Sequence, residues 1–179
     1  MKSVNPIFSL VCLLASACSG IESRDYANLS EEKLSEVADS LAQAYIITDG
    51  HVDLPYRLRV KRFRLEREYL GIPVSTTEGD FDFERARQGG LDAPFMSIYI
   101  PSNQQQLPDQ GKALADSLIT MVEGIASAHP DKFALAKTPQ DIERNTKANK
   151  ISLPMGMENG APIGSDIANV RYFYDRGIR

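Results

Sequence analysis

Cysteines are scarce in this sequence, and net positive charge is absent. Only two cysteines occur among 179 residues, Cys12 and Cys18, so no disulfide framework can hold a domain together. The 20 basic residues are outnumbered by 24 acidic ones, and the resulting net charge of -4 provides no global basic field to attract nucleic acid. With 42% hydrophobic and 25% charged residues, the composition indicates an ordinary globular protein and excludes a disordered or fibrous one.

A hydrophobic run long enough to span a bilayer is also missing. The apolar stretch from Ile7 to Ala17 is too short, but with Lys2 before it and Ala15-Ser16-Ala17 at its end it predicts a signal peptide over residues 1–18. We therefore expect export, with a bacterial periplasm as the destination. Cys18 follows the small residues as in a bacterial lipobox, although Ala15 stands where that motif usually has leucine. Two outcomes stay open: a lipid anchor through Cys18, or ordinary cleavage nearby.

Strand-like and helix-like segments alternate after the leader. The run from Ala44 to Thr48 predicts a fully buried first strand, and the helix that begins at Ser30 should bury one face against other elements. Further strands are expected over 93–100 and 150–157, with helices over 80–87 (capped by Asp80), 109–128, from Thr138 onward (capped by that residue) and over 166–176 (ended by Gly177). Right-handed crossovers between these strands would give an α/β fold with a parallel sheet and helices outside it.

Basic residues gather between the first two strands. Six of the residues from Arg57 to Glu68 are arginine or lysine. A surface that steers substrate or faces a membrane is one interpretation. A solvated helix or loop whose arginine stems cover apolar surface is the other, and we favour it.

His51 and Asp53 carry the clearest chemical signal. They stand two residues apart at the expected end of the first strand, so their side chains should point to the same side. An imidazole nitrogen and a carboxylate oxygen both suit zinc, and in parallel barrels catalytic groups gather at this end of the strands. The alternatives are a hydrogen-bonded turn histidine and an aspartate that caps the next element. Asp49, just before them, fits support of the site and simple exposure equally well.

Glu158 ends the third predicted strand and is followed by Asn159-Gly160, a tight turn that would fix the direction of its side chain. A carboxylate in this position can bridge two metal ions, and an exposed turn acid is the alternative. The other histidine of the chain, His129, should be a solvated residue at a helix end.

Three stretches of the chain resemble one family. The segment from Asp49 to Pro55 closely resembles the signature of the membrane (renal) dipeptidases, dinuclear zinc peptidases of the amidohydrolase superfamily. Residues 87–91 with 95–101, and residues 157–160, match the family in the same order. The resemblance covers roughly residues 40–179.

This resemblance implies the N-terminal portion of a (β/α)8 TIM-type barrel, with about three β/α units over residues 19–179. His51 and Asp53 would bind one zinc ion, and Glu158 would bridge it to a second and so act in catalysis. The implied reaction is the hydrolysis of dipeptides by a hydroxide held on zinc. The second ion would take histidines from strands later than any in this sequence. A second copy of the chain as a partner is left open.

The length of the sequence bears on this interpretation. It is well short of the ~250 residues typical of a closed barrel, and Ile178 and Arg179 look like the approach to a fourth strand. We therefore expect part of a longer protein, with little or no activity by itself. Two other functions stay open. One is a different metal hydrolase of the same superfamily, which would usually show His-x-His. The other is a non-catalytic exported lipoprotein that acts as a binding module.

Overall fold

The computed structural model describes residues 26–60, 73–77, 79–105 and 110–179. Several predictions lie outside these described residues: the signal peptide with its lipobox Cys18, most of the basic segment, and the helix start at Asp109. Within the described ranges no helix is both long enough and apolar enough to cross a membrane.

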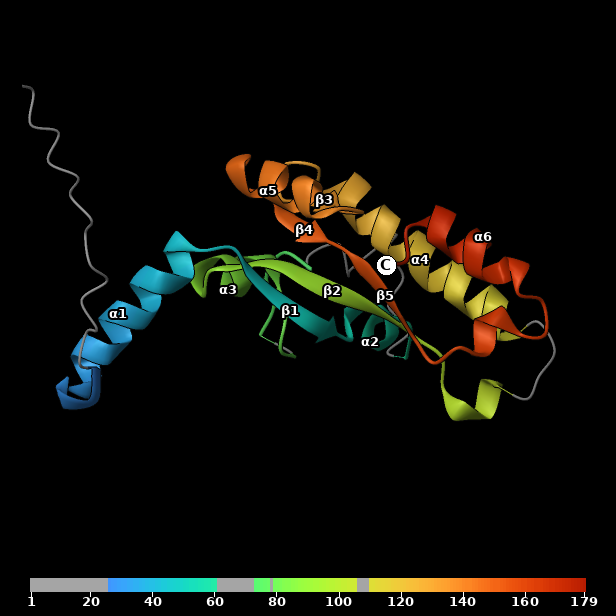
Figure 1. Ribbon diagram of the computed structural model, residues 1–179, viewed down its shortest axis with the longest axis horizontal. Coiled ribbons are helices and arrows are strands. Elements are labelled where there is room, and N and C mark those ends of the chain that lie inside the picture. The colour runs from blue at the N-terminus through green and yellow to red at the C-terminus, as the bar shows by residue number, and fades with distance from the viewer. Residues whose placement is uncertain (1–25, 61–72, 78, 106–109) are drawn as a thin grey trace, which may run out of the picture.

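Strands and helices follow one another along most of the chain, as the sequence predicts (Figure 1). The helices are α1 (Glu31–Ala44), α2 (Leu54–Val60), α3 (Phe83–Gln88), α4 (Gln110–Ala128), α5 (Pro139–Lys147) and α6 (Ala168–Arg176). The strands are β1 (Ile47–Val52), β2 (Leu91–Tyr99), β3 (Phe133–Leu135), β4 (Ile151–Leu153) and β5 (Met155–Glu158). Short 3-10 turns occur at Tyr26–Asn28, Ser102–Gln104 and Ala161–Ile163.

The strands form parallel sheets. One has the order β1-β2-β5, and the other pairs β3 with β4. Ile178 makes a parallel bridge with Met155 of β5, and the backbone N–H of Arg179 donates to the Met155 carbonyl at 3.0 Å. The parallel α/β arrangement is therefore confirmed, and a strand pairing begins at Ile178 where the sequence predicts one. Closure of the sheet into a barrel stays a prediction.

The third predicted strand is divided in two. Residues 150–157 were expected to form one strand, but Pro154 separates β4 from β5. Proline has no N–H to donate to a ladder, whereas its carbonyl still accepts a hydrogen bond from Met96 N at 2.8 Å. As a result β4 pairs with β3 and β5 pairs with β2. The three-residue strand β3 was not predicted, because so short a segment shows no periodicity.

Two predictions of burial are wrong. Ser30 caps α1 as expected, accepting a hydrogen bond from Lys33 N at 3.3 Å, but no residue of α1 is buried. β1 begins at Ile47 rather than Ala44 and is exposed along most of its length. Periodicity and β-branching select the element type, but the covering surface must come from other elements. Figure 1 shows α1 projecting from the rest of the described chain.

Helix caps match the sequence at three of four sites, of which Ser30 is the first. Thr138 forms a capping box with Asp141 on α5, and Gly177 ends α6 in the left-handed conformation with φ 109°. The cap of α3 is Asp82 rather than Asp80, because the backbone is extended at Asp82 and its side chain accepts from Arg85 N at 2.9 Å. Burial alone would raise the pKa of Asp82, but hydrogen bonds from the Arg85 backbone and guanidinium outweigh it and lower that pKa.

The core lies between the sheet and α4. Successive residues of β2 point to opposite faces. Its apolar face joins α4 in one buried cluster that includes Met96, Ile98, Ile100, Leu118, Val122 and Ile125. The other face of β2 carries Ser97, which lines a cavity described below. The sheet thus has a packed face and a face available for chemistry.

Candidate metal centre

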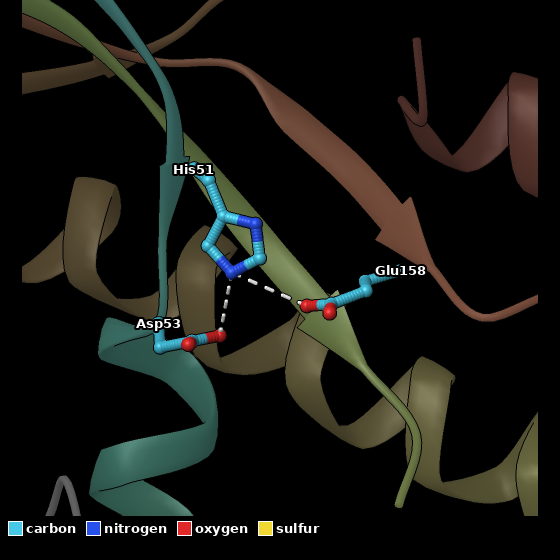
Figure 2. Close-up of side chains that lie close together, drawn as sticks. All are labelled: His51, Asp53 and Glu158. Carbon is cyan, nitrogen blue, oxygen red and sulfur yellow. Dashed lines mark ion pairs between the residues drawn. The ribbon is translucent and has the colours of Figure 1, made fainter.

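The carboxyl ends of β1 and β5 lie on either side of β2, so residues far apart in the sequence meet at one edge. Tyr99 is the register partner of Glu158, and Met96 is the partner of Val52. Figure 2 shows His51 from the end of β1, Asp53 at the start of α2 and Glu158 from the end of β5 pointing toward one another. The structure therefore brings together all three residues that the sequence predicts as metal ligands.

A β-bulge shapes the end of β1. Asp49 pairs with Pro94 and Val52 with Met96, so β1 advances three residues while β2 advances two. Bulges of this kind turn side chains near functional sites, and a proline partner suits a place where the ladder is interrupted. The Asp49 carboxylate accepts a hydrogen bond from His51 N at 2.9 Å. This contact favours the interpretation that Asp49 supports the site over the interpretation that it is simply exposed.

Asp53 joins β1 to α2. Its carbonyl accepts the helical hydrogen bond from Arg57 N at 2.9 Å, so its backbone serves the start of the helix. Pro55 lies in the first turn of α2, where a helix needs no N–H from it. The Asp53 side chain is turned to His51 instead of capping the helix. Backbone and side chain thus have separate roles.

The turn after β5 holds Glu158 in place. Asn159 adopts a left-handed conformation with φ 77°, which asparagine tolerates better than most residues. Its side-chain amide donates to the Ile100 carbonyl at 2.8 Å, and its Oδ1 accepts from Ala161 N at 3.1 Å. These bonds tie the end of β5 to the end of β2, as the predicted Asn-Gly turn requires.

The distances within the cluster suit a single cation. His51 Nε2 lies 3.2 Å from Asp53 Oδ1 and 3.2 Å from Glu158 Oε2. One ligand atom from each residue lies within 4.8 Å of the others. Ligands about 2.0 to 2.1 Å from a tetrahedral zinc ion stand roughly 3.3 Å apart. The side chains are 51%, 55% and 44% exposed for His51, Asp53 and Glu158, so an ion can reach them from solvent.

The hydrogen-bonding capacity of His51 points the same way. Its Nε2 holds either one proton or one lone pair, yet it faces two carboxylate oxygens at the same distance. A hydrogen bond would serve one oxygen well. A cation between the three atoms would serve the nitrogen and both oxygens together, so the donor set fits a metal ion.

A cavity of about 240 Å³ opens beside the cluster and is lined by residues that include His51, Phe95, Ser97 and Glu158. Ser97 is 4% exposed, and its Oγ lies 2.9 Å from Glu158 Oε2. A role for Ser97 was not predicted from the sequence. Its signal was a small polar residue between the apolar Met96 and Ile98.

The second histidine lies outside the cluster. His129 follows α4, and its ring packs edge-on against Phe133 with the ring centroids 6.4 Å apart. The prediction that it stands at a helix end is confirmed, and its ring is partly covered.

A family match accompanies this geometry. Residues 35–179 match the model for membrane dipeptidase, peptidase family M19. The chain belongs to the membrane dipeptidase family. It is 31% identical over 150 residues to Dipeptidase 3 of Mus musculus, an alignment that covers 84% of this chain and 29% of the relative. Dipeptidase ataJ of Aspergillus terreus is 28% identical over 141 residues, covering 74% of this chain and 33% of that protein.

Solved structures of dipeptidases share the fold. The probable dipeptidase PvdM from Pseudomonas aeruginosa superposes with a TM-score of 0.68 at 18% identity, covering 84% of this chain and 37% of that one. A metallopeptidase from Rhodobacter sphaeroides, liganded with a phosphinate mimic of the dipeptide L-Ala-D-Ala, gives a TM-score of 0.62 at 21% identity, covering 75% and 44%. The family match over residues 35–179 confirms the predicted relationship to the membrane dipeptidase family.

Proposed function

We propose that the protein is a metal-dependent dipeptidase in which His51, Asp53 and Glu158 hold the metal. The observation that carries this proposal is the convergence of an imidazole and two carboxylates at the carboxyl ends of β1 and β5. The chain spans only 29% of the length of the mouse relative, so the activity is proposed for the whole enzyme.

We propose zinc as the metal. One nitrogen and two oxygen donors suit it, although manganese and cobalt accept the same ligands. Glu158 binds through Oε2 on the side of His51, and none of the described residues bonds to its Oε1. That second oxygen is available to a second ion, which is the basis for proposing a two-metal centre bridged by Glu158.

The substrate we propose is a dipeptide. The relatives are named dipeptidases, and the Rhodobacter sphaeroides neighbour was solved with a dipeptide mimic. When bound, metal ions would supply Lewis acidity that activates water and polarises the peptide carbonyl. The chain itself contributes the ligands, the Asn159 turn that holds the end of β5 and the wall of the cavity formed by Phe95.

We make three further proposals. The complete domain is a (β/α)8 barrel, with the described strands in its first part. The chain alone has little or no activity, because a two-metal centre needs more than the three ligands clustered in its described part. The protein is exported, and Cys18 anchors it if acylated. A homodimer is left open.

Two experiments test the function. The complete enzyme should hydrolyse dipeptides such as L-Ala-D-Ala and lose activity on addition of a chelator; activity that survives chelation would contradict a metal mechanism. Calorimetric titration of the present chain with Zn²⁺ should give one ion per chain. Tight binding of two ions would overturn the proposed inactivity of the chain, and no binding would overturn the metal site.

A further inference from the structure

Ser97 lies in β2, the strand between the two strands that supply the metal ligands. It lines the same cavity as His51 and Glu158. Its Oγ is 2.9 Å from Glu158 Oε2, and its side chain is nearly fully buried. An ionised carboxylate only accepts hydrogen bonds, so the serine hydroxyl is the donor.

We propose that Ser97 is a positioning residue for the metal centre. Its hydroxyl fixes the Glu158 side chain so that Oε2 faces the point shared with His51 and Asp53. This inference rests on the proposed function, in which those three residues bind the metal.

Glu158 needs such a restraint. Its side chain is long and 44% exposed, and a glutamate in this situation samples many rotamers in water. Ser97 has one short torsion, and its place is set by the pairing of β2 with β5, in which Ser97 is the partner of Gly156. Among the described side chains, Ser97 is the one that donates a hydrogen bond to the Glu158 carboxylate and His51 the one that forms an ion pair with it.

The bond leaves the carboxylate able to bind metal. Oε2 accepts from Ser97 on one side and lies 3.2 Å from His51 Nε2 on the other. A carboxylate oxygen has two lone pairs, so one can accept the hydroxyl while the other meets an ion. Partners of this kind, behind the ligands themselves, orient them and strengthen metal binding.

Packing alone does not explain a serine at this position. Its neighbours Met96 and Ile98 are fully buried in the core, and a buried hydroxyl is costly unless it is hydrogen-bonded. The hydroxyl finds its partner in Glu158.

The test measures metal binding by the full chain, using the absorption spectrum of bound Co²⁺ and calorimetry with Zn²⁺. Ser97→Ala should weaken the affinity by roughly 10- to 100-fold, the range typical of such partners. Ser97→Thr keeps the hydroxyl, and the cavity of about 240 Å³ has room for its methyl group, so its affinity should stay near that of the wild type. Ser97→Val has nearly the shape of threonine without the hydroxyl, so the Thr and Val variants isolate that group even if the alanine variant folds poorly.

Ser152→Ala is the matched control. Ser152 is fully buried in β4, away from the cluster, and its Oγ accepts from Asn145 Nδ2 at 3.1 Å. This variant should bind metal like the wild type.

Each outcome decides the question. Weak binding by the Ala and Val variants with normal binding by the Thr variant supports the inference. Unchanged binding by Ser97→Ala overturns it and leaves the proposed function standing, whereas an equal loss in Ser152→Ala assigns the effect to general packing and also overturns it. If the wild-type chain binds neither ion, the proposed function fails and this inference fails with it.

Discussion

The two faces of β2 differ in what they contribute. Met96 and Ile98 on one face, with Ile100 just after the strand, are fully buried in the cluster shared with α4. Phe95 and Ser97 on the other face line a cavity together with His51 and Glu158, two of the proposed metal ligands. One strand therefore carries stability on one face and chemistry on the other, because strand geometry sends alternate side chains in opposite directions. Mutations on the two faces should separate folding from metal binding.

The largest effect should come from the packed face. Ile98→Ala removes a fully buried side chain from the core, and we expect a loss of about 2–5 kcal/mol in the free energy of unfolding. Urea denaturation followed by circular dichroism measures it. Ile167→Ala is the control, because Ile167 is 79% exposed and its loss should change stability by less than about 0.5 kcal/mol. Equal losses in both variants would break the distinction between packed and exposed positions.

On the face of the sheet that lines the cavity, called the chemical face below, mutations should change metal affinity instead of stability. His51→Ala removes a proposed ligand and should weaken Zn²⁺ binding by more than about 100-fold, beyond what loss of a supporting partner causes. Its free energy of unfolding without metal should change little, because the side chain is 51% exposed. Calorimetry with Zn²⁺ and urea denaturation test both statements. His129→Ala changes the other histidine and should leave metal binding intact; a comparable loss there would contradict the site.

Two glycines differ in the space around them: Gly90 lies at a close backbone contact, and Gly156 lies beside the cavity. A Cβ at Gly90 would meet the Ala42 carbonyl oxygen at 2.5 Å, and its φ is 76°, so Gly90→Ala should destabilise by about 1–3 kcal/mol. At Gly156 the nearest atom is Phe95 Cδ1 at 3.6 Å, an ordinary contact. Gly156→Ala should stabilise by about 0.4–1 kcal/mol through the unfolded chain. Thermal unfolding of both variants gives the order, and the reverse order would show that the chemical face is the more crowded one.

Part of the acid sensitivity of folding should arise away from both faces. The Arg144 guanidinium, then the Lys137 N–H and the Thr138 hydroxyl, hold the pKa of Asp141 well below its usual range. A carboxyl group whose pKa is lower in the folded state than in the unfolded state stabilises the folded protein when the pH is above its unfolded-state pKa of about 4. This contribution is lost as the pH falls through the folded-state pKa.

Asp141→Asn should therefore show a smaller fall in stability between pH 7 and pH 3 than the wild type. Glu143→Gln removes the same charge at an exposed position of the same helix and should keep the wild-type fall. Denaturation curves at the two pH values measure both. An unchanged fall in the Asn variant would remove Asp141 as a source of this sensitivity.

Local signals in the sequence predicted much of this fold. The start of α5 is predicted by Thr138, Pro139 and Asp141, because a capping box depends on neighbouring residues only. The segment from Asp49 to Pro55 likewise contains two of the three proposed metal ligands, His51 and Asp53. Asp82 was not predicted as the cap of α3, because Asp80 has the same side chain two residues earlier. Only the backbone conformation shows which of the two aspartates caps the helix. Ser97 escaped because its role depends on a partner from another strand.

The sequence alone determined most of the helices and strands, the parallel arrangement and the residues whose chemistry suits a metal ion. These follow from periodicity, caps and side-chain chemistry, which act over a few residues. Tertiary structure decided that Pro154 divides the strand run, that α1 and β1 are exposed, and that Glu158 meets His51 across β2. Each of those outcomes depends on the partner that a segment finds in space, and a linear pattern does not contain that information.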